Sequence, residues 1–128
     1  MKAVFLDLKS LDCDDLELNN LQSQFDSFQG CAETAPADVA SRIADADVVI
    51  VNKVVLDKEV LASSASLKHI CIAATGTNNV DLQAAAVLGI SVSNCQAYGT
   101  DSVAQHVMTM MLALHTNLIA YNNAARNG

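Results

Sequence analysis

Two short polar segments of the sequence carry the residues best suited to holding a small anion. Asn52 and Lys53 directly follow an apolar run of β-branched residues, and the stretch 74–79, Ala-Thr-Gly-Thr-Asn-Asn, follows a second apolar run. Gly76 permits a tight bend and a close approach of the backbone to a ligand. Successive free N–H groups in such a bend, together with the positive end of a following helix, can hold a carboxylate or a phosphate. Asn52 could donate a hydrogen bond to the same anion, and Lys53 could add charge.

These residues also have an ordinary structural interpretation. A loop rich in Gly and Asn between a strand and a helix is often only a turn, and a lysine such as Lys53 is more often a solvated surface charge. The pattern of residues by itself leaves both an anion site and a plain turn open.

No other group of residues indicates a catalytic or metal-binding site. His69, His106 and His115 lack a carboxylate partner at a telling spacing, so we expect them to pack within strands and helices. The sequence contains neither Gly-x-Gly-x-x-Gly nor a Walker loop. A receiver domain would have an acidic residue in place of Asn52-Lys53, and a flavodoxin would have a Ser/Thr-rich phosphate loop where this chain has the acidic segment 7–12.

The cysteines are expected to be structural thiols. There is no Cys-x-x-Cys pair and no histidine at metal-ligand spacing, and Cys71 lies in an apolar run, which predicts a small core residue. Reduced thiols and the absence of a signal peptide predict a cytoplasmic protein. The four cysteines are Cys13, Cys31, Cys71 and Cys95.

Length and composition favour one globular domain that binds neither nucleic acid nor membrane. The 128 residues are 52% hydrophobic, which excludes disorder as the default. The net charge is −7 and the few basic residues are scattered, so no surface for nucleic acid or anionic lipid is indicated. The segment 102–125 has no charged residue, but its Gln, His and Asn side chains disfavour a membrane helix.

Strand-like and helix-like segments alternate along the chain, which predicts an α/β fold. Five strands joined by helices imply right-handed parallel units and a flavodoxin-like, three-layer α/β/α domain with the expected strand order 2-1-3-4-5. The predicted strands are 2–8, 24–28, 47–51, 67–73 and 90–92. The first predicted helix is capped by Asp14 or Asp15 and reaches residue 21, and the second spans 36–43 with Pro36 as its first residue. The third spans 58–63 and is capped by Asp57, and the fourth spans 80–88 with Gly89 at its C-cap. The fifth spans 102–122 and begins with a Ser102–Gln105 capping box.

The last predicted helix is apolar over an unusually wide arc. Such a helix needs burial on more than one side, and one sheet covers only one side. A partner or a second domain is therefore expected against it. One apolar stripe consists of Val103, Val107, Met111, Leu114 and Leu118, and the stripe beside it of Met108, Leu112, His115 and Ile119.

An ordered series of motifs between residues 47 and 114 resembles the D-2-hydroxyacid dehydrogenases, and among them most of all the glycerate dehydrogenases (hydroxypyruvate reductases). The series runs Asn-Lys at 52–53, Leu-Lys-x-Ile at 67–70, Ala-Thr-Gly-Thr-Asn-Asn-Val-Asp-Leu at 74–82, Ala-x-x-Gly-Ile-x-Val at 86–92, Asn94, and Tyr-Gly-Thr-x-Ser-Val-Ala-Gln-His at 98–106. Each motif alone is weak, but the order and the gaps make the set specific.

The resemblance implies two domains with a cleft between them. Residues 1–100 would form part of the substrate domain and 101–128 a long interdomain helix, with the nucleotide-binding domain absent. The backbone amides of Thr75, Gly76 and Thr77 would hold the substrate carboxylate, with Asn52 and Lys53 at the rim of the cleft.

The intact family would reduce a 2-keto acid, such as hydroxypyruvate or glyoxylate, with NAD or NADP as the cofactor. Its glycine loop, its acidic ribose-binding residue and its catalytic Arg, Glu and His all lie beyond the position of Gly128. We therefore expect no catalytic residue and no bound cofactor on this chain, only weak binding of the acid, and association of copies through the helix 102–122. Two alternatives stay open: a non-catalytic truncated module acting through protein–protein contacts, and a truncated chain with no function of its own.

Overall fold

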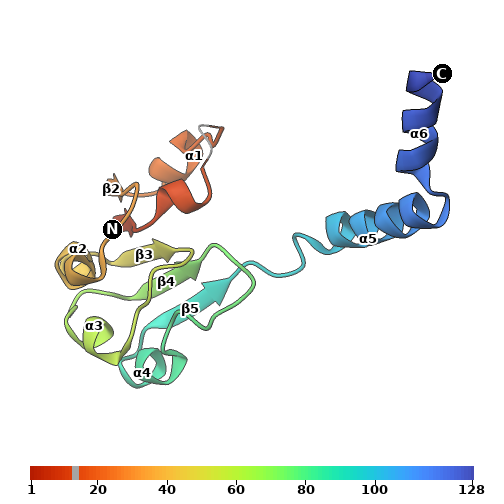
Figure 1. The fold of residues 1–128 in the computed structure, drawn as a ribbon. Coiled ribbons are helices and arrows are strands. Elements are labelled where there is room, and N and C mark those ends of the chain that lie inside the picture. Colours follow the sequence, from red (N-terminus) through yellow and green to blue (C-terminus); the bar gives the residue numbers. More distant parts are fainter. Residues whose placement is uncertain (13–14) are drawn as a thin grey trace. The chain divides into compact units, whose positions relative to one another are not determined.

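The computed structural model describes residues 1–12 and 15–128 (Figure 1). The chain divides into two compact units, Met1–Gln96 and Ala97–Gly128. The first unit contains the whole sheet, and the second contains two helices. Predictions about Cys13 and about Asp14 as a helix cap lie outside the described residues.

The first unit is built on a five-stranded parallel sheet with the order β2-β1-β3-β4-β5, which confirms the predicted fold class. All four residues of the central strand β3 are buried, as its β-branched run predicts. The strands are β1 Lys2–Phe5, β2 Ser27–Gly30, β3 Val48–Val51, β4 His69–Ile72 and β5 Ser91–Asn94.

All five strands depart from their predicted limits, and β1 and β2 show the largest shifts at a single end. β1 ends at Phe5 rather than at residue 8, because Leu8–Ser10 turns into a 3-10 helix, η1. β2 begins at Ser27 rather than at residue 24, because the amides of Gln24 and Phe25 still donate to the carbonyls of Leu21 and Gln22. Local turn bonds therefore override the strand pattern at both places.

The first helix, α1 Asn19–Gln22, is shorter than predicted. The prediction that Asp15 caps a helix is wrong, because α1 begins only at Asn19, with Leu18 as its N-cap. The backbone amides of Asp15 and Leu16 donate to Oδ1 of Asp12, at 3.0 and 3.1 Å.

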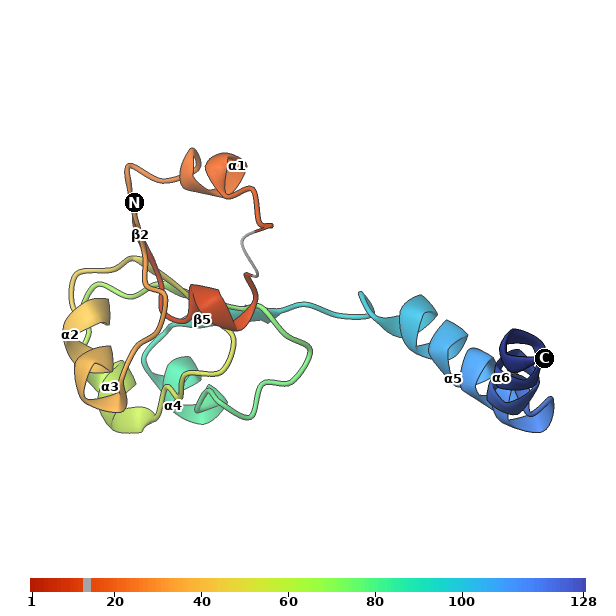
Figure 2. The ribbon, with the colours of Figure 1, turned by 45° about the horizontal axis from the view of Figure 1, so that its top comes forward.

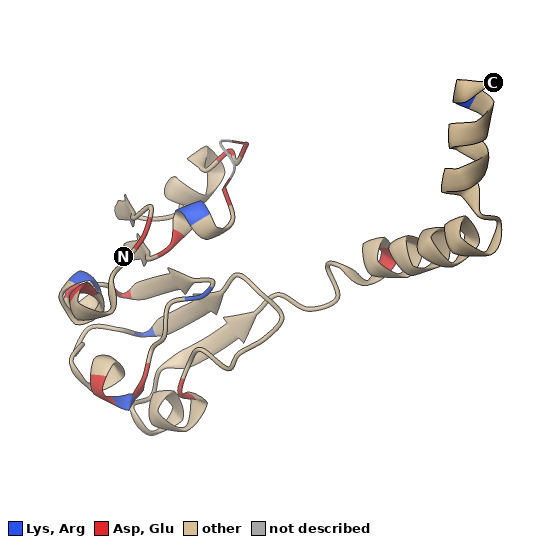
Figure 3. Cartoon of the chain, viewed as in Figure 1, with Lys and Arg blue, Asp and Glu red and all other residues tan. Residues whose placement is uncertain are grey.

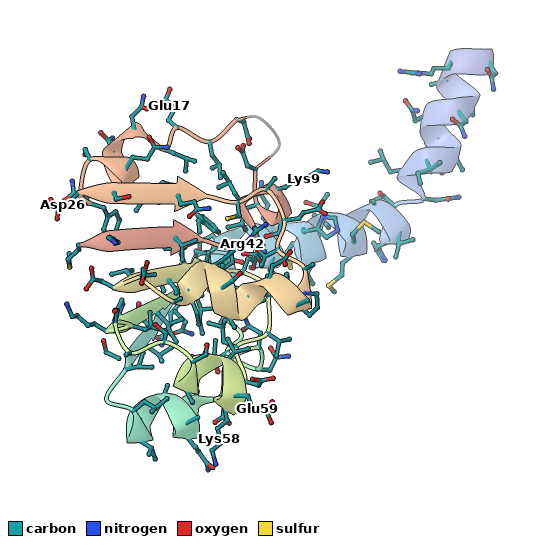
Figure 4. All side chains as sticks on the ribbon, turned by 90° about the vertical axis from the view of Figure 1, so that its left-hand side faces the viewer. Lys9, Glu17, Asp26, Arg42, Lys58 and Glu59 are labelled. Atoms are coloured by element: carbon teal, nitrogen blue, oxygen red, sulfur yellow. The ribbon has the colours of Figure 1, made fainter. Side chains whose placement is uncertain are left out.

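Pro36 and Asp57 mark the starts of the next two helices correctly, whereas the third helix begins at residue 82 rather than at residue 80. Pro36 opens a 3-10 turn, η2 Pro36–Asp38, that continues into α2 Val39–Ile43. The Asp57 carboxylate accepts a hydrogen bond from the Val60 amide at 2.9 Å and caps α3 Lys58–Ala62 (Figure 4 labels its first residues, Lys58 and Glu59). α4 Leu82–Val87 begins after Asp81 and is followed by Gly89, whose φ of +73° is the left-handed conformation predicted there.

Helices α2, α3 and α4 cover one face of the sheet, and α1 lies on the other face (Figures 1 and 2). Right-handed crossovers require helices on both faces. The chain moves across the sheet in one direction from β1 to β2 and in the opposite direction afterwards, so the later helices lie on the face opposite to α1. The main core lies between the sheet and the three helices. Its members include Val49, Val51, Ile70 and Ile72 from the strands and Val39, Ile43, Leu61 and Ala85 from the helices.

An ion pair joins the start of β4 to the residue before β3. The Lys68 ammonium lies 2.6 Å from Oδ1 of Asp47, and the Lys2 amide donates to Oδ2 at 2.8 Å. The Lys68 hydrogen bond, followed by the Lys2 amide, holds the pKa of Asp47 below its ordinary value.

We expect Lys68→Met to raise the pKa of Asp47 towards its ordinary value. A lowered pKa stabilises the folded state above the unfolded-state pKa, and that stabilisation is lost as the pH falls through the folded-state pKa. The stability difference between wild type and variant should therefore be present at neutral pH and vanish in acid. Urea denaturation across this range, with an NMR titration of the Asp47 carboxyl carbon, measures both effects. A difference that persists unchanged below pH 3 would contradict the ion pair as its cause.

The second unit contains two helices, α5 Thr100–His115 and α6 Leu118–Asn127, rather than the one helix predicted at 102–122. Asn117 has a φ of 52°, in the left-handed region that Asn tolerates, and this ends α5. The predicted Ser102–Gln105 capping box is also wrong, because Gly99 is the N-cap and makes no side-chain capping bond. Neither helix contains a buried residue. Among the described residues, no helix is both long and apolar enough to cross a membrane.

Candidate functional site

The two predicted anion-binding segments meet at one edge of the sheet. Asn52 and Lys53 follow β3, and the loop 75–79 follows the neighbouring strand β4. The carboxyl ends of parallel strands lie at the same edge, which is the usual place for a ligand in such sheets. A hollow of about 240 Å³ lies between the two segments. It is lined by Asn52, Lys53, Val55, Ala74, Gly76, Asn78 and Asn79.

The backbone amides of residues 75–79 are the main chemical feature of this hollow. Within the described parts of the chain, none of these five amides donates to a protein acceptor. Two carbonyls of the loop, in contrast, accept hydrogen bonds from other residues of the protein. The Thr75 carbonyl accepts from Nδ2 of Asn94 at 2.7 Å, and the Thr77 carbonyl accepts from the Val80 amide at 3.1 Å. A run of available N–H groups on a loop held by its carbonyls can bind a carboxylate.

Gly76 lies within this loop for a reason other than the predicted tight bend. Its φ is outside the left-handed region, so the backbone itself does not demand glycine. A Cβ atom at this position would lie 3.3 Å from Oδ1 of Asn78, which is tighter than ordinary contact. Glycine therefore keeps the loop compact and leaves its amides accessible to a ligand.

The prediction that the following helix adds its positive end to the site is wrong. α4 begins only at Leu82, and the Asp81 carboxylate already accepts from the Ala84 amide at 2.9 Å. Between the loop and the helix, the Leu56 amide donates to the Asn79 carbonyl at 2.8 Å and the Asp81 amide donates to the Leu56 carbonyl at 2.9 Å. The loop amides therefore act without the helix end.

Asn52 and Lys53 line the same hollow but differ in their surroundings. Asn52 is buried, and its side-chain Nδ2 donates to Oγ of Ser10 at 2.9 Å, so part of its donor capacity is used within the protein. Lys53 is exposed and forms no ion pair with a carboxylate among the residues that the structure describes. Lys53 is thus the cation available to a ligand here. The contact of either side chain with an anion stays a prediction.

The sequence analysis missed Asp7, and it named Asn79 only as a member of the segment 74–79. The buried Asp7 carboxylate accepts the backbone amides of Asn52, Lys53 and Val54 at 2.8, 2.5 and 3.1 Å. Nδ2 of Asn79 donates to the carbonyls of Val54 and Asn52 at 3.1 and 3.5 Å. A signal for Asp7 was present, because an acidic residue inside the apolar run Phe-Leu-Asp-Leu needs a buried partner.

The histidines have different surroundings. The half-buried ring of His69 lies on β4, with Nδ1 2.6 Å from Oγ of Ser91 and Nε2 3.0 Å from Oγ of Ser93, which confirms a packing role in a strand. His106 and His115 are exposed on α5, so the packing predicted for them is not present within their unit.

The cysteines are free thiols in the part of the chain that the structure describes. Cys31 is buried and Cys71 is half-buried, whereas Cys95 is exposed, so the prediction of a buried structural cysteine is wrong for Cys95.

Within residues 1–12 and 15–128, no cluster of three or more His, Cys, Asp or Glu side chains could hold a metal ion. In the part of the chain that the structure describes, the segments coloured as Lys and Arg are scattered along the ribbon and form no cluster (Figure 3).

A doubly wound parallel domain with a loop of available amides beyond its strands belongs to the class of α/β domains whose ligands bind at the carboxyl ends of the strands. The sequence matches the family model "D-isomer specific 2-hydroxyacid dehydrogenase, catalytic domain" over residues 4–127, and the chain belongs to this family.

Curated relatives include enzymes that act on small acids. The glycerate dehydrogenase of Methylorubrum extorquens is 35% identical over 127 residues, which are 99% of this chain and 40% of that protein. The hydroxypyruvate reductase of Blautia hydrogenotrophica is 32% identical over 130 residues, covering 100% of this chain and 40% of that protein. The chain thus spans about 40% of the length of these relatives.

Solved structures show the same fold. An acyclic imino acid reductase in complex with NADPH and D-Arg matches with a TM-score of 0.80 at 22% identity, over 100% of this chain and 41% of that one. The NAD⁺-bound 3-phosphoglycerate dehydrogenase of Entamoeba histolytica matches with a TM-score of 0.72 at 26% identity, over 88% of this chain and 38% of that one.

Proposed function

We propose that this chain supplies the carboxylate-binding part of an NAD(P)-dependent D-2-hydroxyacid dehydrogenase that acts on a 2-keto acid such as hydroxypyruvate or glyoxylate. The observation that carries the proposal is the run of available amides at residues 75–79 beside Lys53. The relatives named glycerate dehydrogenase and hydroxypyruvate reductase support the substrate class. Family membership favours this function over the alternative of a non-catalytic module.

The role of the chain in the reaction is to bind and orient the acid. The loop amides of Thr75, Gly76 and Thr77 would hold the carboxylate, and the Lys53 ammonium would add attraction at the rim. Anchoring the carboxylate fixes the position of the adjacent keto carbon, which is the reacting atom.

NAD or NADP is proposed for the intact protein, because related structures were solved with these cofactors. The residues of this chain do not fit such a dinucleotide, since the sequence has no glycine-rich phosphate loop. The catalytic groups that reduce the keto carbon are therefore proposed to lie outside these 128 residues. A cytoplasmic location fits the free thiols Cys31, Cys71 and Cys95.

Titration of the ¹⁵N-labelled chain with glyoxylate tests the proposal. We expect the amide signals of residues 75–79 to shift in a saturable way, while NADH mixed with chain and glyoxylate is not oxidised. Methylglyoxal, which replaces the carboxylate by a methyl ketone, is the matched control ligand and should leave these signals unmoved. Saturable shifts elsewhere with none in the loop would reject the site, and clear NADH turnover would reject a purely binding role.

We also propose that two copies of the chain associate through α5. Large apolar side chains of this helix, including Val103, Met111 and Leu114, are 60% or more exposed within the described residues. Such a surface marks an interaction site, and a second copy supplies a self-complementary partner.

Met111→Lys places a charge in this apolar face of α5, so light scattering should find a monomer where the wild-type chain is a dimer. Arg126→Ala, a change at the end of α6, serves as the control. A wild-type chain that is strictly monomeric at high concentration would contradict the proposal.

A further inference from the structure

The segment that follows β1 makes no part of the hollow's lining, yet it holds one of the hollow's walls. The buried Asp7 carboxylate accepts three consecutive amides, those of residues 52–54. Three residues further on, Oγ of Ser10 accepts from Nδ2 of Asn52 at 2.9 Å. Asp7 and Ser10 therefore bind both the backbone and one side chain of the turn 52–54.

The carbonyls of the same turn are held from the other direction. Nδ2 of Asn79 donates to the carbonyl of Val54 at 3.1 Å and, more weakly, to that of Asn52 at 3.5 Å. Asn79 is the last residue of the amide loop 75–79. The turn 52–54 is thus fixed between Asp7, which takes its amides, and the amide loop, which takes its carbonyls.

We infer that Asp7 is a positioning residue of the carboxylate site, acting through the turn that carries Asn52 and Lys53. The Asp7 carboxylate does not line the hollow itself and accepts the backbone amides of two lining residues, Asn52 and Lys53, so its effect on a ligand is indirect. A carboxylate that accepts several N–H groups is strongly directional, and such support decides how tightly a site is held in its binding geometry. This inference rests on the proposed function of the loop as a carboxylate site.

The charge of Asp7 makes the sign of a substitution informative. If Asp7 acted only through its charge, its removal would strengthen the binding of an anion, because a nearby negative charge repels the ligand. If Asp7 positions the turn, its removal weakens binding. Asp7→Asn keeps the shape and one acceptor oxygen but turns an amide group towards backbone N–H groups, so it separates the two effects.

The test is a glyoxylate titration of the whole chain and its variants, followed by NMR. We expect Asp7→Asn to weaken glyoxylate binding by about tenfold. In metal sites, removing an outer hydrogen bond that orients a ligand residue lowers the affinity about 10- to 100-fold, and the expected loss lies at the lower end of that range. The amides of Lys53 and Val54 should also exchange with solvent faster without ligand. The matched control is Asp57→Asn, which makes the same charge change at a carboxylate that accepts the Val60 amide at the start of α3. Its affinity should be unchanged.

Each outcome bears on one claim. Equal or tighter binding by Asp7→Asn, while the wild type binds, would overturn the inference and leave the proposed function standing. A wild type that does not bind glyoxylate would reject the proposed function, and the inference with it. Should Asp7→Asn not fold, Ser10→Ala removes an exposed hydroxyl and should weaken binding about fivefold, as expected for one hydrogen bond. Unchanged affinity of Ser10→Ala would then contradict the inference.

Discussion

Replacing Gly76 by valine is expected to abolish measurable glyoxylate binding while the domain stays folded. Gly76 lines the hollow, and a Cβ atom there already lies 3.3 Å from Oδ1 of Asn78. The two further methyl groups of valine would occupy the space beside the loop amides or push the loop out of shape. Because the φ of Gly76 is outside the left-handed region, the backbone itself accepts a side chain. The fold should therefore survive a change that removes the site.

The experiment compares three chains by NMR titration with glyoxylate. Gly76→Ala should weaken binding less than Gly76→Val, because its single methyl group meets only the flexible end of Asn78. Gly99→Val is the matched control, since the φ of Gly99 is −100° and nothing lies within 4 Å of its added Cβ. We expect wild-type affinity from Gly99→Val. Full affinity in a folded Gly76→Val chain would show that the anion does not bind at this loop.

Replacing Leu61 by alanine should give the largest loss of stability among the changes considered. Leu61 is fully buried in α3 and packs in the core between the helices and the sheet. Truncating a buried leucine removes hydrophobic burial and leaves a cavity, together costing about 2–5 kcal/mol. That is a large part of the roughly 5–15 kcal/mol by which domains are stable.

Urea denaturation measures this loss, with Leu82→Ala as the matched control. Leu82 lies at the start of α4 and is 45% exposed. Its truncation should change the free energy of unfolding by about 0.5 kcal/mol or less. Equal effects of the two substitutions would contradict a core centred between the sheet and helices α2 to α4.

Hydrophobic pattern and capping chemistry were enough to predict most of the fold. The β-branched run of β3 is typical of a strand buried on both faces. Asp57 marks a helix start because its carboxylate accepts the amide of nearby Val60, and Pro36 marks one by its fixed φ and its missing N–H. These features are local, so the sequence contains all that is needed to recognise them. The strand order was predicted from the common flavodoxin-like arrangement of such parallel sheets.

The helix 102–122 shows where a local pattern is insufficient. Its apolar spacing continues through residues 116 and 117, yet Asn117 adopts a left-handed conformation and divides α5 from α6. Asn visits that conformation at little cost, so periodicity alone does not reveal the break.

The sequence by itself therefore determined the parallel α/β architecture and the two segments, 52–53 and 74–79, that could bind an acid, because residue type and spacing encode them directly. Only the tertiary structure decided how these segments are held. Asp7 lies 45 residues before Asn52 in the chain, yet its carboxylate accepts the Asn52 amide at 2.8 Å. The same structure shows that Asp81, rather than a ligand, occupies the start of α4. Hydrogen bonds between distant segments depend on side-chain directions that the packed sheet sets, and no local pattern contains them.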